Sequence, residues 1–97
     1  MMVEIRKTEV FAKWINGLRD TRARARVLVR IERMAAGNPG DVRAVGEGVS
    51  EMRIDCGPGY RVYFRKEKLE VILLLAGGDK RTQAKDIKTA LQMARDL

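Results

Sequence analysis

Residues 51–64 read EMRIDCGPGYRVYF, and this stretch decides the fold because it predicts two strands and the turn between them. On each side of the turn apolar side chains alternate with polar ones, and a period of two is typical of half-buried strands. Residues 57–59, Gly-Pro-Gly, interrupt the pattern, since proline fixes φ and glycine admits positive φ. The stretch therefore predicts a β-hairpin whose inward side chains are Met52, Ile54, Val62 and Phe64.

A three-residue loop at 57–59 sets the expected pairing of the two strands. It places Asp55 opposite Arg61 and Arg53 opposite Tyr63, and it keeps the apolar side chains together. A four-residue loop would turn a charged side chain into the core. The other face of the hairpin is then polar, aromatic and rich in guanidinium groups, and we expect the functional residues there.

Length and composition indicate one globular domain over residues 1–97, because a chain of 97 residues buries enough surface for one core. The longest apolar run, residues 71–76, is too short to cross a bilayer. The first residues lack the apolar stretch of a signal peptide. We therefore expect a cytoplasmic protein without a membrane partner.

The residue types also limit the chemistry. The sequence has no histidine and one cysteine, Cys56, which excludes the usual zinc sites and the catalytic triads that need imidazole. We expect no metal and no cofactor, and we expect Cys56 to be a small buried side chain. The formal net charge of +7 favours a polyanionic partner, with nucleic acid first and an acidic protein second.

The remaining segments predict helices and strands around the hairpin. Their order is strand, two helices, three strands and helix, with a glycine-rich loop over residues 37–48. This order predicts an α+β fold in which two helices pack on one face of a mostly antiparallel sheet of about four strands, leaving the other face partly open. Beside the hairpin, the expected elements are a strand over 3–6, a helix capped by Thr8, a helix from Asp20 to about Ala36, a strand over 69–76 and a helix capped by Thr82.

A stripe of arginines follows one side of the second helix, opposite apolar residues that include Val27, Leu28 and Ile31. Such a stripe is most often a solvated surface. It can also follow the phosphates of ribosomal RNA, in which case activity falls as salt rises. The stripe consists of Arg22, Arg26, Arg30 and Arg33.

Two stretches carry a resemblance to a known family. They are GNPGDVRAVGEGVSEMRIDCGPGYRVYF, residues 37–64, and LLLAGGDKRTQAKDIKTA, residues 73–90. With the order of the elements, they resemble the RelE/ParE toxin superfamily, specifically its HigB-like branch, often labelled addiction module killer protein. The resemblance covers nearly the whole chain. It implies a RelE-like fold and the toxin of a type II toxin–antitoxin pair, whose partner is a helix-turn-helix antitoxin of the HigA-like kind.

The resemblance also implies an activity, the ribosome-dependent cleavage of messenger RNA by attack of a ribose 2′-hydroxyl on the adjacent phosphate. By this resemblance Arg61 contacts the scissile phosphate. Lys80 and Arg81 help to hold the phosphate or protonate the leaving oxygen. Glu51 or Arg53 takes part in activating the nucleophile.

Chemical reasoning adds roles and an alternative. Glu51 is a candidate base if bound RNA buries it and raises its pKa, and Lys80 is a better acid than any arginine. Tyr63 is a candidate for stacking on a base, and Gln83 for a hydrogen bond to a base or ribose. Spacing alone instead favours solvated cross-strand ion pairs, and the resemblance reverses that preference for Arg61.

Two other functions stay open. One is a non-enzymatic poison of DNA gyrase, similar to the ParE branch, and the other is a catalytically silent nucleic-acid-binding protein. Arg53, Arg61 and Lys80 favour the nuclease, because the gyrase-binding relatives need no cluster that handles phosphate.

Overall fold

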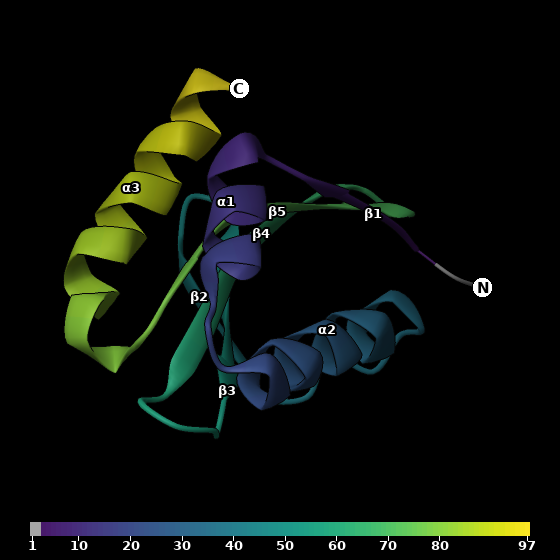
Figure 1. Ribbon diagram of the computed structural model, residues 1–97. Helices are drawn as coiled ribbons and strands as arrows, with labels where there is room; N and C mark the ends of the chain where they lie inside the picture. Colours follow the sequence, from purple (N-terminus) through teal and green to yellow (C-terminus); the bar gives the residue numbers. More distant parts are fainter. Residues whose placement is uncertain (1–2) are drawn as a thin grey trace.

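Five strands form a single mixed sheet in the computed structural model, which describes residues 3–97 (Figure 1). The strand order is β1-β5-β4-β3-β2, with β1 parallel to β5 and the other neighbours antiparallel. The strands are β1 (Glu4–Lys7), β2 (Val42–Gly46), β3 (Val49–Ile54), β4 (Tyr60–Lys68) and β5 (Val71–Gly78).

The prediction of a mostly antiparallel sheet of about four strands was wrong, because β2 lies within the predicted loop over residues 37–48. β2 turns back onto β3 through Glu47 and Gly48, whose φ angles of 51° and 80° are in the left-handed region. Its register with β3 shifts between Ala44 and Gly46. An edge strand with mostly exposed residues and an irregular register has no clear apolar alternation, so the sequence pattern does not reveal it.

Helices α1 (Glu9–Gly17) and α2 (Thr21–Ala35) pack on one face of the sheet. The predicted N-caps of these two helices are confirmed, since Thr8 accepts a hydrogen bond from the Phe11 amide and Asp20 accepts from the amides of Arg22 and Ala23. The third predicted cap, Thr82, precedes the last helix, but its side chain makes no capping hydrogen bond within the described residues. Leu28 was expected on the buried side of α2, but it is 45% exposed. The core on this face contains Phe11, Ile15, Val27, Ile31, Met34, Met52, Ile54, Val62, Phe64, Ile72 and Leu74.

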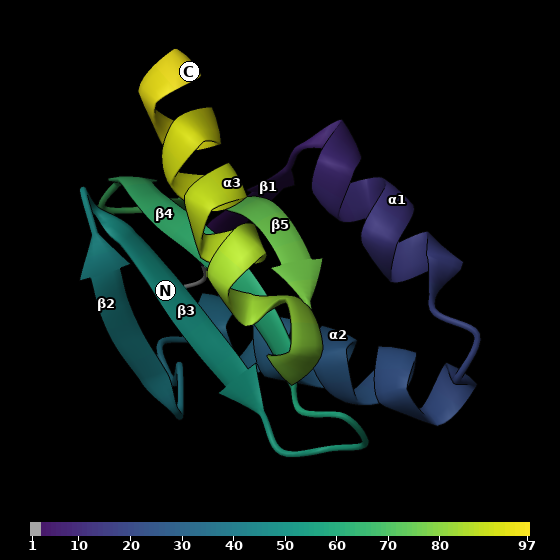
Figure 2. The same ribbon diagram turned by 90° about the vertical axis from the view of Figure 1, so that its left-hand side faces the viewer.

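Helix α3 (Gln83–Asp96) covers the opposite face, which the sequence analysis expected to be partly open. Figure 2 shows α3 crossing in front of the strands, with α2 behind them and α1 to the side of β5. A 3₁₀ turn, η1 (Lys80–Thr82), joins β5 to α3. The polar face of the hairpin therefore lies largely beneath a helix. The second core contains Val49, Tyr63, Leu73, Leu75, Ala76, Ala90 and Ala94.

The hairpin forms as predicted, but its register is shifted. Arg53 pairs with Arg61 and Glu51 pairs with Tyr63, whereas the predicted partners were Asp55 for Arg61 and Arg53 for Tyr63. The connecting loop is residues 55–59, two residues longer than expected at its start. A shift by two residues leaves every side chain on its predicted face, because the side-chain period of a strand is two.

No helix in residues 3–97 is both long enough and apolar enough to cross a membrane.

Candidate functional site

A pocket of about 400 Å³ opens at the turn end of the β3–β4 hairpin, and we call it the hairpin pocket. It brings together Arg53, Arg61 and Lys80, which are three of the four predicted catalytic residues. They come from the end of β3, the start of β4 and the turn before α3. The complete lining is Asp41, Arg53, Ile54, Asp55, Gly59, Arg61 and Lys80.

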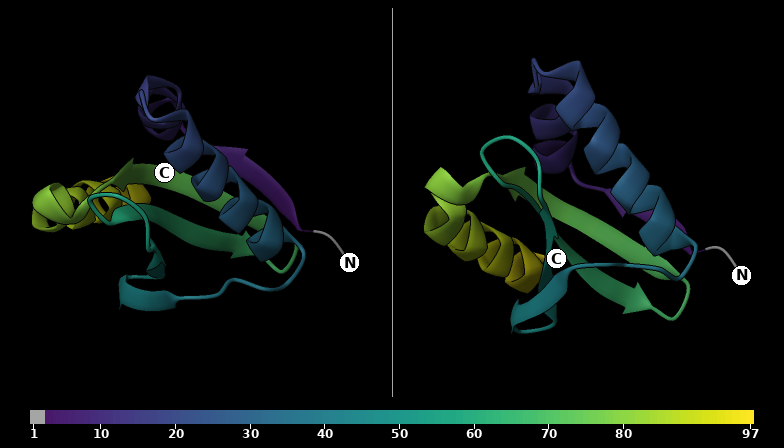
Figure 3. Two further views of the ribbon diagram at one scale, coloured as in Figure 1. Left: turned by 60° about the horizontal axis from the view of Figure 1, so that its bottom comes forward. Right: turned by 90° about the horizontal axis from the view of Figure 1, so that it is seen from below.

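The loop of the hairpin holds this pocket together. The teal loop in the right panel of Figure 3 lies between the start of α3 and the helices of the other face. The backbone amide of Lys80 donates a 3.4 Å hydrogen bond to the Pro58 carbonyl, which ties the turn before α3 to the loop. Gly59 has a φ of 80°, and a Cβ there would lie 3.0 Å from Nη1 of Arg61. Glycine at this position therefore leaves room for the arginine beside it.

Arg61 is held from two sides. Its Nη1 donates to the Gly59 carbonyl at 2.5 Å, and its Nε lies 3.7 Å from Oε2 of Glu51. Only 12% of the side chain is exposed. This buried Nε has no hydrogen-bond partner among residues 3–97, so the carboxylate attracts it by charge rather than by a formed bond. The guanidinium is thus fixed at the wall of the hairpin pocket.

Glu51 is fully buried under α3 and does not line the hairpin pocket. Arg43 Nε donates to it at 2.9 Å, Tyr63 Oη at 3.0 Å and Gln83 Nε2 at 3.0 Å. Burial by itself would raise the pKa of Glu51, but these three hydrogen bonds outweigh it and hold the pKa below its usual value. Glu51 is therefore an ionised internal group that supports Arg61. A general base must reach the ribose hydroxyl, and Glu51 does not fit that predicted role.

Tyr63 and Gln83 belong to the same buried network, although both were predicted to contact RNA. Tyr63 is fully buried, so its ring offers no surface for stacking on a base. Burial and the neighbouring Glu51 carboxylate both raise the pKa of Tyr63, so its hydroxyl stays protonated and donates to Glu51. Gln83 uses its amide group on the same carboxylate.

Arg53 lies in the hairpin pocket as half of an ion pair that the sequence analysis missed. Its Nη2 is 2.8 Å from Oδ1 of Asp41, and both side chains are about half exposed. The hydrogen bond to Asp41 and the charge of that carboxylate raise the pKa of Arg53. Asp41 immediately precedes β2 and was concealed within the predicted loop. The pairing of β2 with β3 would have revealed this ion pair, because it brings Asp41 beside Arg53 and places the Arg53 amide 2.9 Å from the Asp41 carbonyl.

The pocket holds a second carboxylate, Asp55, which is exposed and forms no ion pair within residues 3–97. Asp55 was predicted to face Arg61 across the hairpin, but it lies in the longer loop, and Arg61 pairs with Arg53 instead. Arg81 was predicted to help Lys80. Its side chain is 80% exposed, pairs with Asp79 at 2.9 Å and lies outside the pocket lining.

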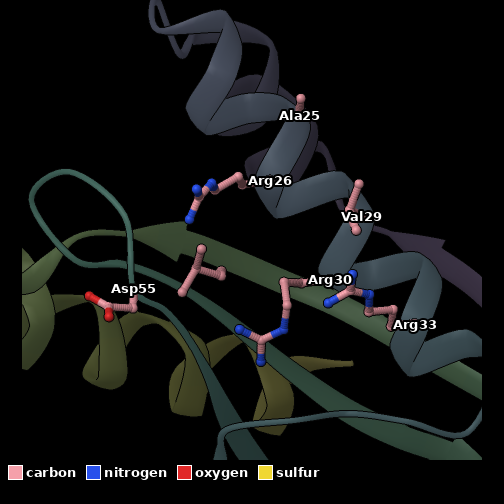
Figure 4. Close-up of a pocket in the computed structure, with 7 residues that line it drawn as sticks. Ala25, Arg26, Val29, Arg30, Arg33 and Asp55 are labelled. Carbon is pink, nitrogen blue, oxygen red and sulfur yellow. The ribbon is translucent and has the colours of Figure 1, made fainter.

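Three arginines of the predicted stripe line a second pocket, of about 480 Å³, which we call the α2 groove. Arg22 is exposed and lies outside it. Figure 4 shows the guanidinium groups of Arg26 and Arg30 directed into the space between α2 and the sheet, with Asp55 across from them. The complete lining is Ala25, Arg26, Val29, Arg30, Arg33, Ile54 and Asp55.

Comparisons with known proteins place the chain in a family. The family model described as Phage derived protein Gp49-like (DUF891) matches residues 13–96. A protein of Haemophilus influenzae, itself described as uncharacterized, is 44% identical over 97 residues, which is 100% of this chain and 98% of the relative. The Gp49-like family lies within the RelE/HigB-like toxin superfamily, whose RelE-type toxins are endoribonucleases and whose members have antitoxin partners. The chain therefore belongs to the Gp49-like family of phage-derived, toxin-like proteins.

Proposed function

We propose that this protein is the toxin of a type II toxin–antitoxin pair and that it cleaves messenger RNA on cytoplasmic ribosomes. The observation that supports the proposal is the convergence of Arg53, Arg61 and Lys80 on the hairpin pocket. Family membership supports the same chemistry, because RelE-type toxins are endoribonucleases. A gyrase poison of the ParE kind would have no need of this cation cluster.

The proposed reaction uses these cations around one phosphate. The ribose 2′-oxygen attacks the adjacent phosphorus while its proton passes to a base, and the bond from phosphorus to the 5′-oxygen breaks. The products are a cyclic phosphate and a 5′-hydroxyl. Arg61, fixed by Glu51 and the Gly59 carbonyl, stabilises the charge that develops on the phosphorane. Arg53 adds positive charge beside it.

Lys80 is the proposed acid, because an ammonium group gives up its proton more readily than a guanidinium does. It would protonate the leaving 5′-oxygen. Asp55 is the proposed base, in place of the buried Glu51, because its carboxylate is exposed in the same pocket. Arg81 and the arginines of α2 are exposed or partly exposed near the pocket, and we assign to them contacts with phosphates of the message and of ribosomal RNA.

The proposed partner is a helix-turn-helix antitoxin of the HigA-like kind, which covers the basic surface and keeps the toxin inactive. A net charge of +7 suits an acidic partner surface as well as RNA. Co-expression with the protein encoded by the neighbouring reading frame should restore growth and yield a stable complex.

The decisive experiment adds purified protein to translating ribosomes with a defined message and maps the new 5′ ends. Wild-type protein should cut within translated codons, and Arg61→Ala should remove the cuts. Arg95→Ala is the matched control, because Arg95 pairs with Glu47 on the surface, outside the hairpin pocket. Asp55→Asn should lower the cleavage rate about 10²- to 10⁴-fold, as expected for loss of a general base.

Intact messages during growth arrest would contradict the nuclease proposal. A parallel supercoiling assay would then detect gyrase inhibition. Binding of RNA that falls with salt, without any cleavage, would point to the silent nucleic-acid-binding protein.

A further inference from the structure

The α2 groove and the hairpin pocket share a wall. Ile54 and Asp55 line both of them, so the two hollows are neighbours along the end of β3. The groove is one side of α2, since its helical members recur with the spacing of successive turns. An extended ligand that leaves the hairpin pocket past Asp55 therefore enters the α2 groove.

The groove combines apolar and guanidinium groups. Val29 is 42% exposed although it is apolar, and it lies between the arginines of the same helix face. Ala25 and Ile54 extend this apolar floor. A flat nucleic-acid base can lie on apolar and guanidinium surfaces, while guanidinium groups also bind phosphate oxygens in a bidentate manner.

The three arginines of the groove differ in their freedom. Arg30 Nη1 donates to the Arg53 carbonyl at 2.7 Å, and its Nη2 donates to the Pro39 carbonyl at 3.1 Å. Arg30 therefore fixes α2 to the end of β3, at a residue of the hairpin pocket. Arg26 and Arg33 are exposed and form no ion pair within the described residues, so they remain available to a ligand.

We propose that the α2 groove is a nucleotide subsite, which binds the base and phosphate next to the linkage held in the hairpin pocket. This inference rests on the proposed function and makes it more specific, since the substrate becomes a single strand that spans both hollows. Six cations follow one another from Arg33 through Arg30 and Arg26 to the cations of the hairpin pocket. A strand that carries a phosphate and a flat base in every unit matches this alternation of charge and apolar surface better than a peptide does.

The test measures binding of 2′-O-methyl oligouridylates of two to six nucleotides by fluorescence anisotropy. The methyl group blocks the attacking oxygen, so binding is read without cleavage. For wild-type protein, the affinity should rise sharply at the length at which the strand reaches the groove, and we call this rise the length step. Arg26→Gln combined with Arg33→Gln should remove that step, with about a 10- to 100-fold loss for the hexamer and little change for the dinucleotide. The slope of log affinity against log salt should fall by about 1.4, the value for two phosphate contacts on a single strand.

The matched control is Lys13→Gln combined with Arg19→Gln. It removes the same charge from exposed side chains that line neither hollow, and it should keep the length step. Equal weakening of dinucleotide and hexamer by the groove variant would overturn the inference, since general charge would then explain the binding. So would polyglutamate binding that depends on Arg26 and Arg33 while hexamer binding does not, because the groove would then take an acidic peptide.

The outcome is separable from that of the nuclease test. If messages stay intact on ribosomes but the length step depends on Arg26 and Arg33, the proposed function fails and the groove remains a nucleotide site. If Arg61→Ala abolishes cleavage but the step is absent in wild-type protein, the nuclease stands and the subsite is wrong.

Discussion

The Nε of Arg61 lies 3.7 Å from Oε2 of Glu51, and this pair connects the interior beneath α3 to the hairpin pocket. Glu51 is fully buried and receives hydrogen bonds from β2, β4 and α3. The guanidinium that we assign to the phosphate is thus positioned by a carboxylate that no substrate touches.

Glu51→Gln should lower kcat about 10- to 100-fold with little change in KM, because the neutral amide no longer attracts Arg61 and a small displacement of a reacting group is costly. Steady-state cleavage over a range of concentrations of ribosome-bound message gives the two constants. Circular dichroism should show that the variant remains folded. A raised KM with an unchanged kcat would show that Glu51 does not position Arg61 for the chemical step.

Lys80→Ala should affect kcat, whereas Arg81→Ala should affect KM. Lys80 lines the hairpin pocket, so its loss should lower kcat about 10²- to 10⁴-fold, as for removal of a general acid. Arg81 is 80% exposed and paired with Asp79, so its loss should raise KM a few-fold and leave kcat nearly unchanged. The same cleavage assay measures both. Equal kcat losses in the two variants would argue against Lys80 as the specific acid.

Tyr63→Phe should lower the free energy of unfolding by about 1 kcal/mol at neutral pH, because a buried hydrogen bond to Glu51 is lost. The folded-state pKa of Glu51 lies below its usual 4.5, so its stabilising contribution is full above about pH 4.5 and disappears as the pH falls through the lowered pKa. In the variant, Glu51 has lost one hydrogen-bond donor, so its pKa is lowered less than in the wild type. Urea unfolding should therefore show that the difference in the free energy of unfolding between variant and wild type becomes smaller in acid. A difference that stays constant with pH would contradict the assignment of this free energy to the hydrogen bond with ionised Glu51.

Gly77→Ala should be strongly destabilising, by about 1–3 kcal/mol or more, because a Cβ at this position would lie 2.1 Å from the Trp14 ring. Gly17→Ala is the control. Among residues 3–97, no atom outside its own helix backbone and its chain neighbours lies within 4 Å of a Cβ at Gly17, so that variant should match or slightly exceed wild-type stability. Thermal unfolding of the two variants compares them directly. Similar melting temperatures would mean that Trp14 and α1 can move away from β5.

The strongly patterned parts of the fold could be predicted from the sequence. The hairpin follows from alternation, and the starts of α1 and α2 follow from Thr8 and Asp20, because these signals act within a few residues. Strand β2 could not be predicted in this way. It is an exposed edge with a register shift, and its position depends on pairing with β3 rather than on its own composition.

The candidate site was predicted in part for a similar reason. Arg53 and Arg61 flank the hairpin turn, and Lys80 follows the end of β5, which pairs with the start of β4, so the three meet in one pocket as the resemblance implied. Glu51 and Tyr63 looked exposed because they alternate with apolar residues. A strand pattern distinguishes two faces of a sheet but does not say that a helix covers the second one. The apolar side of α3, with Ala90 and Ala94, was the available signal, since it needed a surface to pack on.

The hydrogen bond from the Lys80 amide to the Pro58 carbonyl has a consequence for the protein during its synthesis. The hairpin pocket is lined by residues from Asp41 to Lys80, and Gln83, later in the sequence, completes the support of Glu51. A nascent chain that has not yet been extended past this point contains no assembled site. With the proposed function, the translating ribosome therefore meets no assembled nuclease site before residue 83 has been added.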